Sequence, residues 1–337
     1  MDWFEKIAGF KECDYPTTQE RLVVEGNTLR STSTQKSFRM GDFSVPSLAE
    51  LREQAAAGSG SSGRLKVSLV SADVRKLHST PSLKGALFQV ASQFNMLEMT
   101  SYEVTPEDGV TRYRYDPTQG PACAIAAGAA TIYRNYLLPI DGSKGQRANR
   151  QIDGLADVGT CLAGLLGKPV SELWTMRNGY CLGRQEGLVS ISDLLDEIGE
   201  ADINAIRGHL RIGIHQDVAV TDEEATPDQL VSQAFCSAMP VAYSRVPSKL
   251  WRSFAILVLE AAYEATIWAS VCNARRGASN TVLLTRLGGG AFGNDDEWII
   301  RAISRALHLA RDHQLDVRIV SYREPSMALR NLAAEYA

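Results

Sequence analysis

The stretch "RLGGGAFGN" (286–294) is the part of the sequence best suited to binding an anion. It follows the β-favouring run "TVLLT" and precedes "DDEWIIRAISRALHLARDH", which has helical periodicity. Between a strand and a helix, unpaired backbone N–H groups and the helix dipole attract negative charge, and glycines let a phosphate approach the main chain. We expect a phosphate on the amides of 288–293. A structural turn, with Asn294 or Asp295 as the N-cap of the helix, is the alternative.

A second segment of this kind is "DPTQGPACAIAAGAA" (116–130), in which Gln119-Gly120-Pro121 leads into a helix whose first turns are small. Small residues there would let another backbone segment cover the far side of a diphosphate. A plain helix started by proline is the alternative. The stretch "AGSGSSGR" (57–64) lacks the Gly-Lys-Ser/Thr ending of a P-loop, so it predicts a flexible linker.

The elements that must position these segments alternate between strands and helices. Apolar runs predict strands at 64–74, 85–95, 210–220, 281–287 and 315–322. Helical periodicity predicts helices at 47–56, 122–137, 250–273 and 296–313, with mostly helical structure at 141–205. This alternation favours an α/β domain with a largely parallel sheet, in which ligands bind at the carboxyl ends of the strands. We therefore expect the polar strand ends to meet at one edge, namely Ser71–Asp73, Gln93–Asn95, His215–Asp217, Gly288–Asn294 and Ser321–Arg323.

Composition and charge narrow the class of protein. The chain has 337 residues, 45% of them hydrophobic and 22% charged, which is enough apolar material for a large core. The net charge of −4 provides no basic field, so neither nucleic acid nor an anionic membrane is the expected partner. The N-terminus has no signal-peptide core, and the apolar helix near 254–273 contains Glu260 and Glu264. We expect this helix to be too short and polar to span a bilayer, and the protein to be soluble and cytoplasmic.

The cysteines and histidines show none of the spacings that bind metals. The six cysteines are scattered without a CxxC pair, which predicts reduced thiols. The five histidines form neither HxH nor HExxH, and no G-x-S-x-G motif is present. We therefore expect no metal and no cofactor.

At this point the motifs resemble those of a macrodomain, the family of ADP-ribose-binding α/β/α sandwiches. The segment "VSADVRKL" is similar to an early strand end of the family, with Ala72 in the place of a glycine. This resemblance implies that Asp73 holds the adenine amine and that Val74 belongs to the same ligand-binding segment. The segment "VASQFN" is similar to the next strand end, which implies that Asn95 reaches the distal ribose, with Gln93 beside it.

In this resemblance the two glycine-containing segments bind the phosphates. The first implies diphosphate contacts from Gln119, Gly120 and Ala122. The second implies contacts along its whole length, from Gly288, Gly289, Gly290, Ala291, Phe292, Gly293 and Asn294. A phenylalanine in a tight loop has little reason to be buried, so we expect Phe292 on the distal ribose or lining the pocket.

The resemblance covers roughly 64–137 and 208–325. It leaves out 1–63, an N-terminal extension with its linker, and 141–205, a helical insertion. Two features of the family are missing, because residues 96–119 replace the usual glycines after the Asn and the Asn-Ala-Ala-Asn pattern is absent. The catalytic residues of the common branches therefore do not transfer to this chain.

Bound ADP-ribose could be hydrolysed from an acceptor at C1″ of the distal ribose. This reaction needs an acid for the leaving group or a carboxylate to orient water. The candidates are Glu98, Asp116, His215, Asp217, Asp295 and Asp296. The alternatives are a surface or structural role for the first two, a satisfied His–Asp pair for the middle two and helix capping for the last two.

The sequence thus predicts a three-layer α/β/α macrodomain-like sandwich with a mixed, largely parallel sheet over residues 64–337. The expected function is an ADP-ribosyl hydrolase whose partner is ADP-ribose or an ADP-ribosylated protein. A reader that binds ADP-ribose without turnover is one alternative, and a binder of another NAD-derived nucleotide is the other. The oligomeric state is left open.

Overall fold

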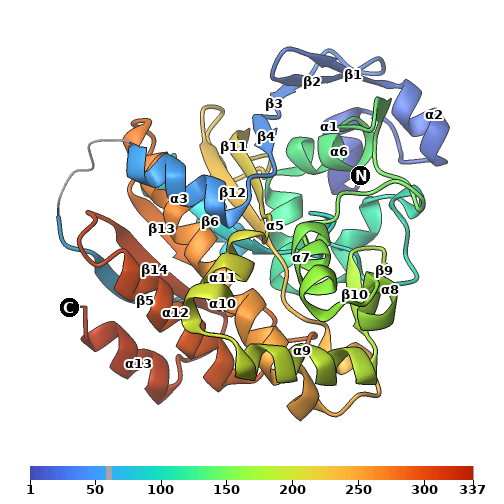
Figure 1. Ribbon diagram of the computed structural model, residues 1–337. Coiled ribbons are helices and arrows are strands. Elements are labelled where there is room, and N and C mark those ends of the chain that lie inside the picture. The colour runs from blue at the N-terminus through green and yellow to red at the C-terminus, as the bar shows by residue number, and fades with distance from the viewer. Residues whose placement is uncertain (58–62, 337) are drawn as a thin grey trace.

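Figure 1 shows the computed structural model of the chain, which describes residues 1–57 and 63–336. The expected linker at 57–64 falls mostly outside these residues. The helices are α1 (Trp3–Ala8), α2 (Tyr15–Glu20), α3 (Leu48–Ala57), α4 (Val74–His78), α5 (Gln119–Ala126), α6 (Gly128–Tyr136), α7 (Ala156–Leu166), α8 (Val170–Leu173), α9 (Gln185–Glu197), α10 (Glu200–Gly208), α11 (Ser248–Arg275), α12 (Asp296–Leu309) and α13 (Met327–Ala334). The strands are β1 (Leu22–Glu25), β2 (Thr28–Ser31), β3 (Ser37–Arg39), β4 (Asp42–Ser44), β5 (Lys66–Ser71), β6 (Leu87–Ala91), β7 (Pro139–Ile140), β8 (Ser143–Lys144), β9 (Trp174–Arg177), β10 (Tyr180–Gly183), β11 (Gly213–Ala219), β12 (Leu230–Cys236), β13 (Thr281–Leu284) and β14 (Asp316–Ser321).

Seven strands form the central sheet in the order β4-β11-β12-β6-β13-β14-β5. The last five in this order run parallel to one another, whereas β11 is antiparallel to both β12 and β4. All four residues of β13 are buried, as expected for a parallel strand covered on both faces. The predicted α/β fold with a mixed, largely parallel sheet is confirmed.

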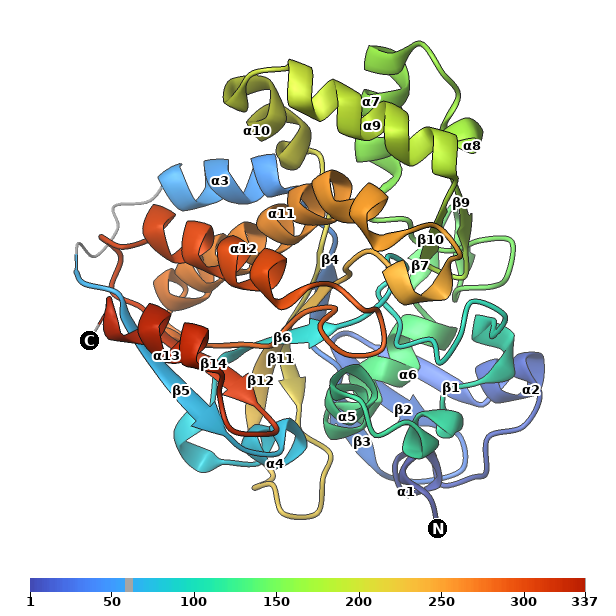
Figure 2. The same ribbon diagram turned by 90° about the horizontal axis from the view of Figure 1, so that it is seen from below.

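Helices cover both faces of the sheet and form two separate cores. Figure 2 shows α3, α11 and α12 on one side of the sheet and α4, α5 and α6 on the other. On the first side, Phe254 and Ile303 pack in one cluster with Val282 of β13. On the second side, Cys123 of α5 packs in another cluster with Phe88 of β6. This is the three-layer arrangement that the alternation of elements predicts.

Helix α11 is longer and more apolar than the sequence analysis assumed. It has 28 residues and is apolar enough to cross a membrane, which corrects the expectation for 254–273. However, 94% of its most apolar window is buried within the protein, so it is a core helix here. Its Glu264 accepts hydrogen bonds from Arg52 of α3 (2.7 Å) and Arg305 of α12 (2.5 Å). A buried carboxylate needs such partners, and these two tie neighbouring helices to α11.

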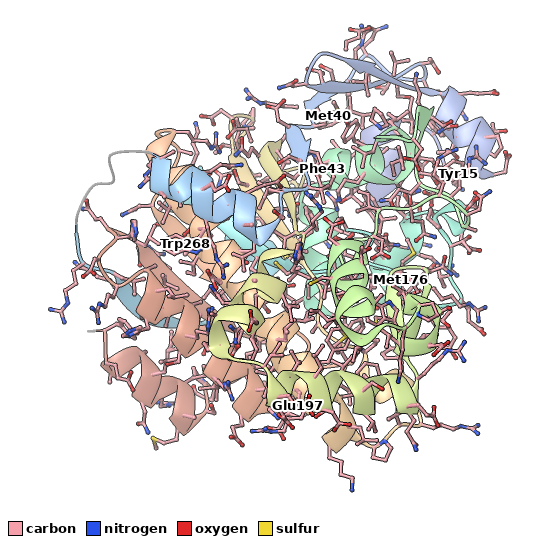
Figure 3. All side chains as sticks on the ribbon, in the orientation of Figure 1. Tyr15, Met40, Phe43, Met176, Glu197 and Trp268 are labelled. Carbon is pink, nitrogen blue, oxygen red and sulfur yellow. The ribbon has the colours of Figure 1, made fainter. Side chains whose placement is uncertain are left out.

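The N-terminal extension packs onto the core and contributes an edge strand. Phe43 of β4, labelled in Figure 3, belongs to this strand. Its ring contacts that of His215 in β11 edge-on, with 5.2 Å between centroids. Farther upstream, Glu12 accepts hydrogen bonds from the backbone N–H groups of Val110 (2.8 Å) and Thr111 (2.7 Å). The extension thereby holds the segment 96–119, which carries two of the candidate carboxylates.

The segment 141–205 is mostly helical, as expected, with α7, α8, α9 and most of α10, and it also contains a hairpin that was not predicted. Strands β9 and β10 pair in antiparallel fashion around a turn at Asn178 (φ +47°) and Gly179 (φ +78°). Two successive residues with positive φ are typical of the tight hairpin turns for which Asn-Gly is preferred. The hairpin contacts the segment that follows the carboxyl end of the central strand β6, since Phe94 N donates to Gly179 O at 3.0 Å.

Candidate active site

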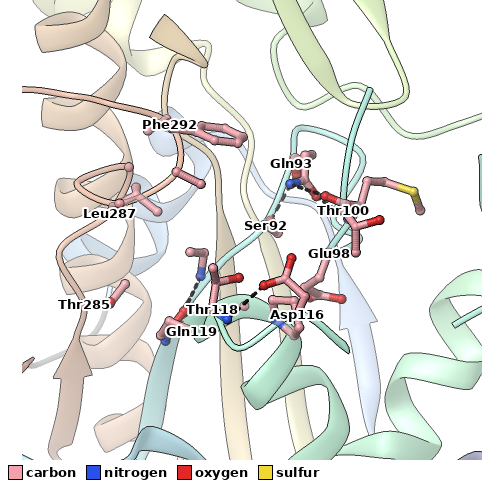
Figure 4. Close-up of a pocket in the computed structure, with 18 of the residues that line it drawn as sticks. Ser92, Gln93, Glu98, Thr100, Asp116, Thr118, Gln119, Thr285, Leu287 and Phe292 are labelled. Atoms are coloured by element: carbon pink, nitrogen blue, oxygen red, sulfur yellow. Dashed lines mark hydrogen bonds between the residues drawn. The ribbon is translucent and has the colours of Figure 1, made fainter. Parts of the chain in front are cut away.

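A cavity of about 150 Å³ lies at the carboxyl ends of the neighbouring strands β6 and β13 (Figure 4). Its lining comes from residues 91–93 and 98–100 after β6, Asp116 and 118–121 at the start of α5, 285–288 and 290–292 after β13, and Tyr180, Ala238 and Tyr243. Both glycine-containing segments of the sequence analysis therefore meet at this cavity. Among the predicted ligand-binding residues, the lining includes Gln93, Gln119, Gly120, Gly288, Gly290, Ala291 and Phe292.

The middle of the glycine run borders open space and has unpaired amides. Gly288 (φ +72°) and Gly293 (φ +71°) have left-handed backbone conformations, which glycine adopts without strain. A Cβ on Gly290 would have no heavy atom within 4 Å. Within the described part of the chain, the N–H groups of Gly288, Gly290 and Ala291 have no acceptor. They are therefore free to bind an anion.

The end of the same run behaves as the turn-and-cap alternative expects. Asn294 N donates to Gly288 O at 3.0 Å, and Asp295 is the side-chain N-cap of α12. Gly289 approaches this helix, because a Cβ on it would lie 2.9 Å from Ile299 Cδ1. The loop is thus closed by its final residues, while its middle remains available to a ligand.

The N-terminus of α5 borders the cavity and is fastened to β6. Gln119 Oε1 accepts from Ala91 N at 2.8 Å, and its Nε2 donates to Gln89 O at 2.9 Å. A Cβ on Gly120 would lie 2.0 Å from Ala91 O and 3.2 Å from Glu98 Cγ, so glycine permits this close approach. The N–H groups of Gln119 and Gly120 find no acceptor among the described residues. The positive end of the helix dipole is therefore available at the cavity.

Glu98 is the buried carboxyl group of the cavity. It belongs to the lining although its side chain is 0% exposed. Arg134 Nη2 lies 3.3 Å from its Oε1. Burial raises the pKa of Glu98 to about 7, against the opposing effect of the Arg134 charge. A group with this pKa can both donate and accept a proton at neutral pH, as general acid–base catalysis requires.

Asp116 is a second, half-buried carboxylate of the same cavity. Its Oδ1 accepts from Thr118 N at 2.9 Å, which fixes the turn before α5. Figure 4 shows Glu98 and Asp116 on one side of the cavity and Leu287 and Phe292 on the other. A ligand that spans the cavity would therefore meet carboxyl groups on one side and the glycine run on the other.

Three aromatic rings form one wall of the cavity. The Phe292 ring lies 5.3 Å from that of Tyr180 and 5.5 Å from that of Tyr243, between centroids. Tyr180 comes from the hairpin of the insertion, and its hydroxyl donates to Met99 O at 2.7 Å. Phe292 lines the pocket, as one of its two expected roles requires. Neither tyrosine was predicted as a site residue, although Asn-Gly at 178–179 is a sequence signal for the hairpin that carries Tyr180.

Several predicted ligand-binding residues lie outside the cavity lining, namely Asp73, Val74, Asn95, Ala122, Gly289, Gly293 and Asn294. Asn95 is buried, and its Nδ2 donates to Gln151 Oε1 at 2.8 Å while its Oδ1 accepts from Leu97 N at 3.1 Å. In the structure, the Asn95 side chain therefore links the segment after β6 to Gln151 by hydrogen bonds. Asp73 lies at the end of β5 and caps α4.

The expected convergence of polar strand ends is wrong for β11, because this strand is antiparallel to β12. Its end lies at the opposite edge, where Asp217 (φ +54°) pairs with Arg276 at 2.8 Å. His215 is buried, and its Nδ1 lies 3.3 Å from Arg134 Nη1. Among the remaining candidates, Asp296 pairs with Arg286 beside the glycine run.

The described residues include no group of three or more His, Cys, Asp or Glu side chains that could hold a metal ion. All six cysteines are free thiols. The cavity lining offers a ligand carboxyl groups, backbone amides and aromatic rings, together with polar side chains such as those of Arg286 and Thr118.

Comparisons with known proteins find likeness in structure and none in sequence. No family model matches the chain, and no curated protein matches it. The chain is similar to the crystal structure of poly(ADP-ribose) glycohydrolase from Deinococcus radiodurans in complex with ADP-ribose, with 13% identity and a TM-score of 0.45 over 88% of this chain and 95% of that chain. It is also similar to poly(ADP-ribose) glycohydrolase from Thermomonospora curvata, with 12% identity and a TM-score of 0.41 over 88% of this chain and 85% of that chain. Likeness at this level supports no conclusion about ligand or reaction.

Proposed function

We propose that this chain is a hydrolase that binds ADP-ribose and releases it from a protein or small-molecule acceptor by cleavage at C1″ of the distal ribose. One observation carries the proposal. Glu98, whose pKa is about 7, borders the same cavity as the unpaired amides of Gly288, Gly290 and Ala291. A carboxyl group of this kind is suited to proton transfer, and the amides are suited to phosphate.

The diphosphate would lie between the glycine run and the N-terminus of α5. Each side offers backbone N–H groups without an acceptor in the described chain, and Gly290 leaves room for close approach. The distal ribose would then lie near Phe292 and Glu98. The macrodomain resemblance implies that the adenine reaches Asp73, so the ligand would cross the carboxyl ends of β6, β13, β14 and β5.

The two carboxyl groups have complementary roles in the proposed reaction. Glu98 gives its proton to the leaving atom of the acceptor as the bond from C1″ to that atom breaks. A water attacks C1″, which has oxocarbenium character at that point, and passes a proton to Asp116. The products are free ADP-ribose and the unmodified acceptor. The aromatic wall helps to exclude other water from the reacting carbon.

A reader without turnover is the second candidate, since it would use the same amides. Recognition alone does not require a buried carboxyl group that titrates near neutrality, and burying one is costly. Glu98 therefore favours the hydrolase over the reader.

The test is a linkage-by-linkage hydrolysis assay. Proteins carrying single ADP-ribosyl groups on Arg, Ser or Glu/Asp, and O-acetyl-ADP-ribose, are incubated with the purified protein, and released ADP-ribose is measured. We expect release from at least one substrate, with a loss of about 10²-fold or more in Glu98→Gln. The matched control is Glu223→Gln, because this side chain is 79% exposed and the chemical change is identical. Survival of all linkages with excess protein that still binds ADP-ribose would instead establish the reader.

A further inference from the structure

Arg134 is the ionic partner of Glu98 and is not part of the cavity lining. Both side chains are 0% exposed. Glu98 and Asp116 belong to the cavity lining, whereas Arg134 does not. The Nη2 atom of Arg134 lies 3.3 Å from Glu98 Oε1 and 3.5 Å from Oε2. The cation therefore contacts the carboxyl group that would react without contacting the ligand.

Four elements hold the guanidinium of Arg134 in place. Its Nε donates to Met96 O at 3.1 Å in the segment after β6, and its Nη1 donates to His215 Nδ1 at 3.3 Å in β11. Its Nη2 also donates to Thr131 Oγ1 at 3.3 Å, one turn earlier in α6. The Phe235 ring of β12 covers its face, with the guanidinium carbon 3.8 Å from the ring centroid. With each nitrogen engaged and its face covered, the group has little freedom to move.

Asp116 lines the cavity together with Glu98, and the buried titratable groups on the protein side of Glu98 are neutral at neutral pH. Burial raises the pKa of Tyr113 and that of Cys123 well above their ordinary values. Burial also lowers the pKa of His215 well below its ordinary value, with a contribution from the Arg134 charge. Burial lowers the pKa of Arg134 itself, but a guanidinium stays protonated at neutral pH. Arg134 is thus the permanent charge that faces Glu98 from the protein side.

We propose that Arg134 is a positioning residue, a fixed buried cation that orients the Glu98 carboxyl group and governs whether it carries a proton. This inference rests on the proposed function for its catalytic meaning. Arg134 would act through Glu98 from outside the cavity lining and would not contact ADP-ribose.

The consequence for the reaction follows from charge. When Glu98 gives its proton to the leaving atom, a carboxylate forms in a site from which water is excluded. A cation 3.3 Å away stabilises this carboxylate, and it is already in place before the proton moves. Burial favours the protonated form and Arg134 favours the ionised form, so removing Arg134 leaves burial unopposed.

The experiment measures the titration of the Glu98 carboxyl carbon by NMR in ligand-free wild type, Arg134→Met and Arg134→Lys, with Glu98→Gln for assignment. We expect the pKa of Glu98 to rise by about one unit or more in Arg134→Met. Arg134→Lys keeps a cation but lacks the planar guanidinium group, so the pKa of Glu98 should rise less in this variant than in Arg134→Met. In the hydrolysis assay, the pH at which kcat begins to fall should move upward with the NMR value, with KM little changed.

Arg134→Lys keeps the proposal testable if the methionine variant does not fold. Its expected signature is a smaller upward shift in the Glu98 titration and a lower kcat at a pH where Glu98 is protonated. An unchanged titration in the folded variants would overturn the proposal. So would equal shifts in the lysine and methionine variants, because the charge would then not matter.

The NMR titration needs no substrate, so the two proposals fail in different ways. A shifted Glu98 titration in a protein that cleaves no ADP-ribosyl bond would overturn the hydrolase but retain the control of Glu98 by Arg134. Hydrolysis by wild type, together with an unshifted titration in the variants, would retain the hydrolase and overturn the role of Arg134.

Discussion

A Cβ atom added to Gly120 would lie 2.0 Å from the carbonyl oxygen of Ala91, so the first turn of α5 is in direct contact with the end of β6. The same Cβ would lie 3.2 Å from Glu98 Cγ. This contact joins the helix N-terminus and the buried carboxyl group in one packed unit. The relative position of the α5 N-terminus and Glu98 therefore requires a residue without a Cβ atom at position 120.

Gly120→Ala should damage both stability and activity. The added methyl group must push α5 away from β6, which should cost about 1–3 kcal/mol of unfolding free energy. The displacement should also reduce ADP-ribosyl hydrolysis, since Glu98 moves with it. Denaturant titration and the hydrolysis assay check the two effects. Gly164→Ala in α7 is the matched control, because a Cβ there meets no heavy atom within 4 Å. A variant at Gly120 with wild-type stability and rate would contradict the packing described.

The buried carboxyl group predicts a specific pH dependence of stability. The pKa of Glu98 rises from an ordinary 4.5 to about 7 in the folded protein. Between these values the folded state holds a proton that the unfolded state has released, so the contribution of Glu98 to stability falls as pH rises from about 4.5 to 7. Above that range and below it, the contribution is constant.

Thermal or denaturant unfolding of wild type and Glu98→Gln at pH 5, 6 and 7 measures this effect. Wild type should lose stability relative to the variant as the pH rises, because glutamine does not titrate. A difference between the two proteins that stays constant from pH 5 to 7 would mean that Glu98 does not titrate near neutrality.

Glu264 should show the opposite dependence. Burial acts to raise the pKa of Glu264, but hydrogen bonds from Arg52 and Arg305 outweigh it, and the net pKa lies below its ordinary 4.5. Its stabilising contribution is therefore present above pH 4.5 and is lost as the pH falls through the folded value. At neutral pH, Glu264→Gln should cost about 1.5–3 kcal/mol, since it weakens the hydrogen bonds from two partly exposed arginine charges to a buried carboxylate. Denaturant titration tests this, with Glu324→Gln as control because that side chain is 85% exposed. Equal stabilities of the two variants would contradict the prediction.

The hairpin of the insertion should matter to catalysis through Tyr180. Its hydroxyl donates to Met99 O at 2.7 Å, next to Glu98 in the chain, so Tyr180→Phe removes a bond that holds the catalytic segment. We expect a loss of about 1–3 kcal/mol in unfolding free energy and a lower kcat. Tyr322→Phe is the control, because this tyrosine is 85% exposed. Identical kcat in both variants would show that the hairpin wall does not position the segment.

Much of the architecture could be predicted because its signals are local. Apolar runs predicted the strands β5, β6, β13 and β14. The glycine run between β13 and α12 predicted one side of the cavity. The direction of β11 could not be predicted in this way, because an apolar run does not indicate whether its strand pairs in parallel or antiparallel fashion with its neighbours. Its partners decide it, and they put Asp217 at the opposite edge.

Other features depended on partners that are distant in sequence. Strand β12 escaped prediction because it buries the polar residues Ser232 and Gln233 in its middle, where Gln233 Nε2 donates to Cys123 O at 3.0 Å. Asn95 is predicted to bind the ligand, and the hydrogen bond from its amide to Gln151, 56 positions away, could not be predicted from any local pattern. Glu98 was a candidate from its position in the chain, but its buried partner Arg134 could not be identified without the fold.

The most direct test of the central claim is titration calorimetry with ADP-ribose, with AMP and ADP alongside. The variant Gly290→Glu places a negative charge where a Cβ meets no heavy atom, so the fold should tolerate it while a phosphate should not. Gly164→Glu makes the same change in α7, outside the cavity lining. We predict micromolar binding of ADP-ribose to wild type and to Gly164→Glu, stronger than binding of AMP or ADP, and a sharp loss of affinity in Gly290→Glu. Absence of ADP-ribose binding to the folded wild type, or equal affinity in both variants, would contradict this prediction.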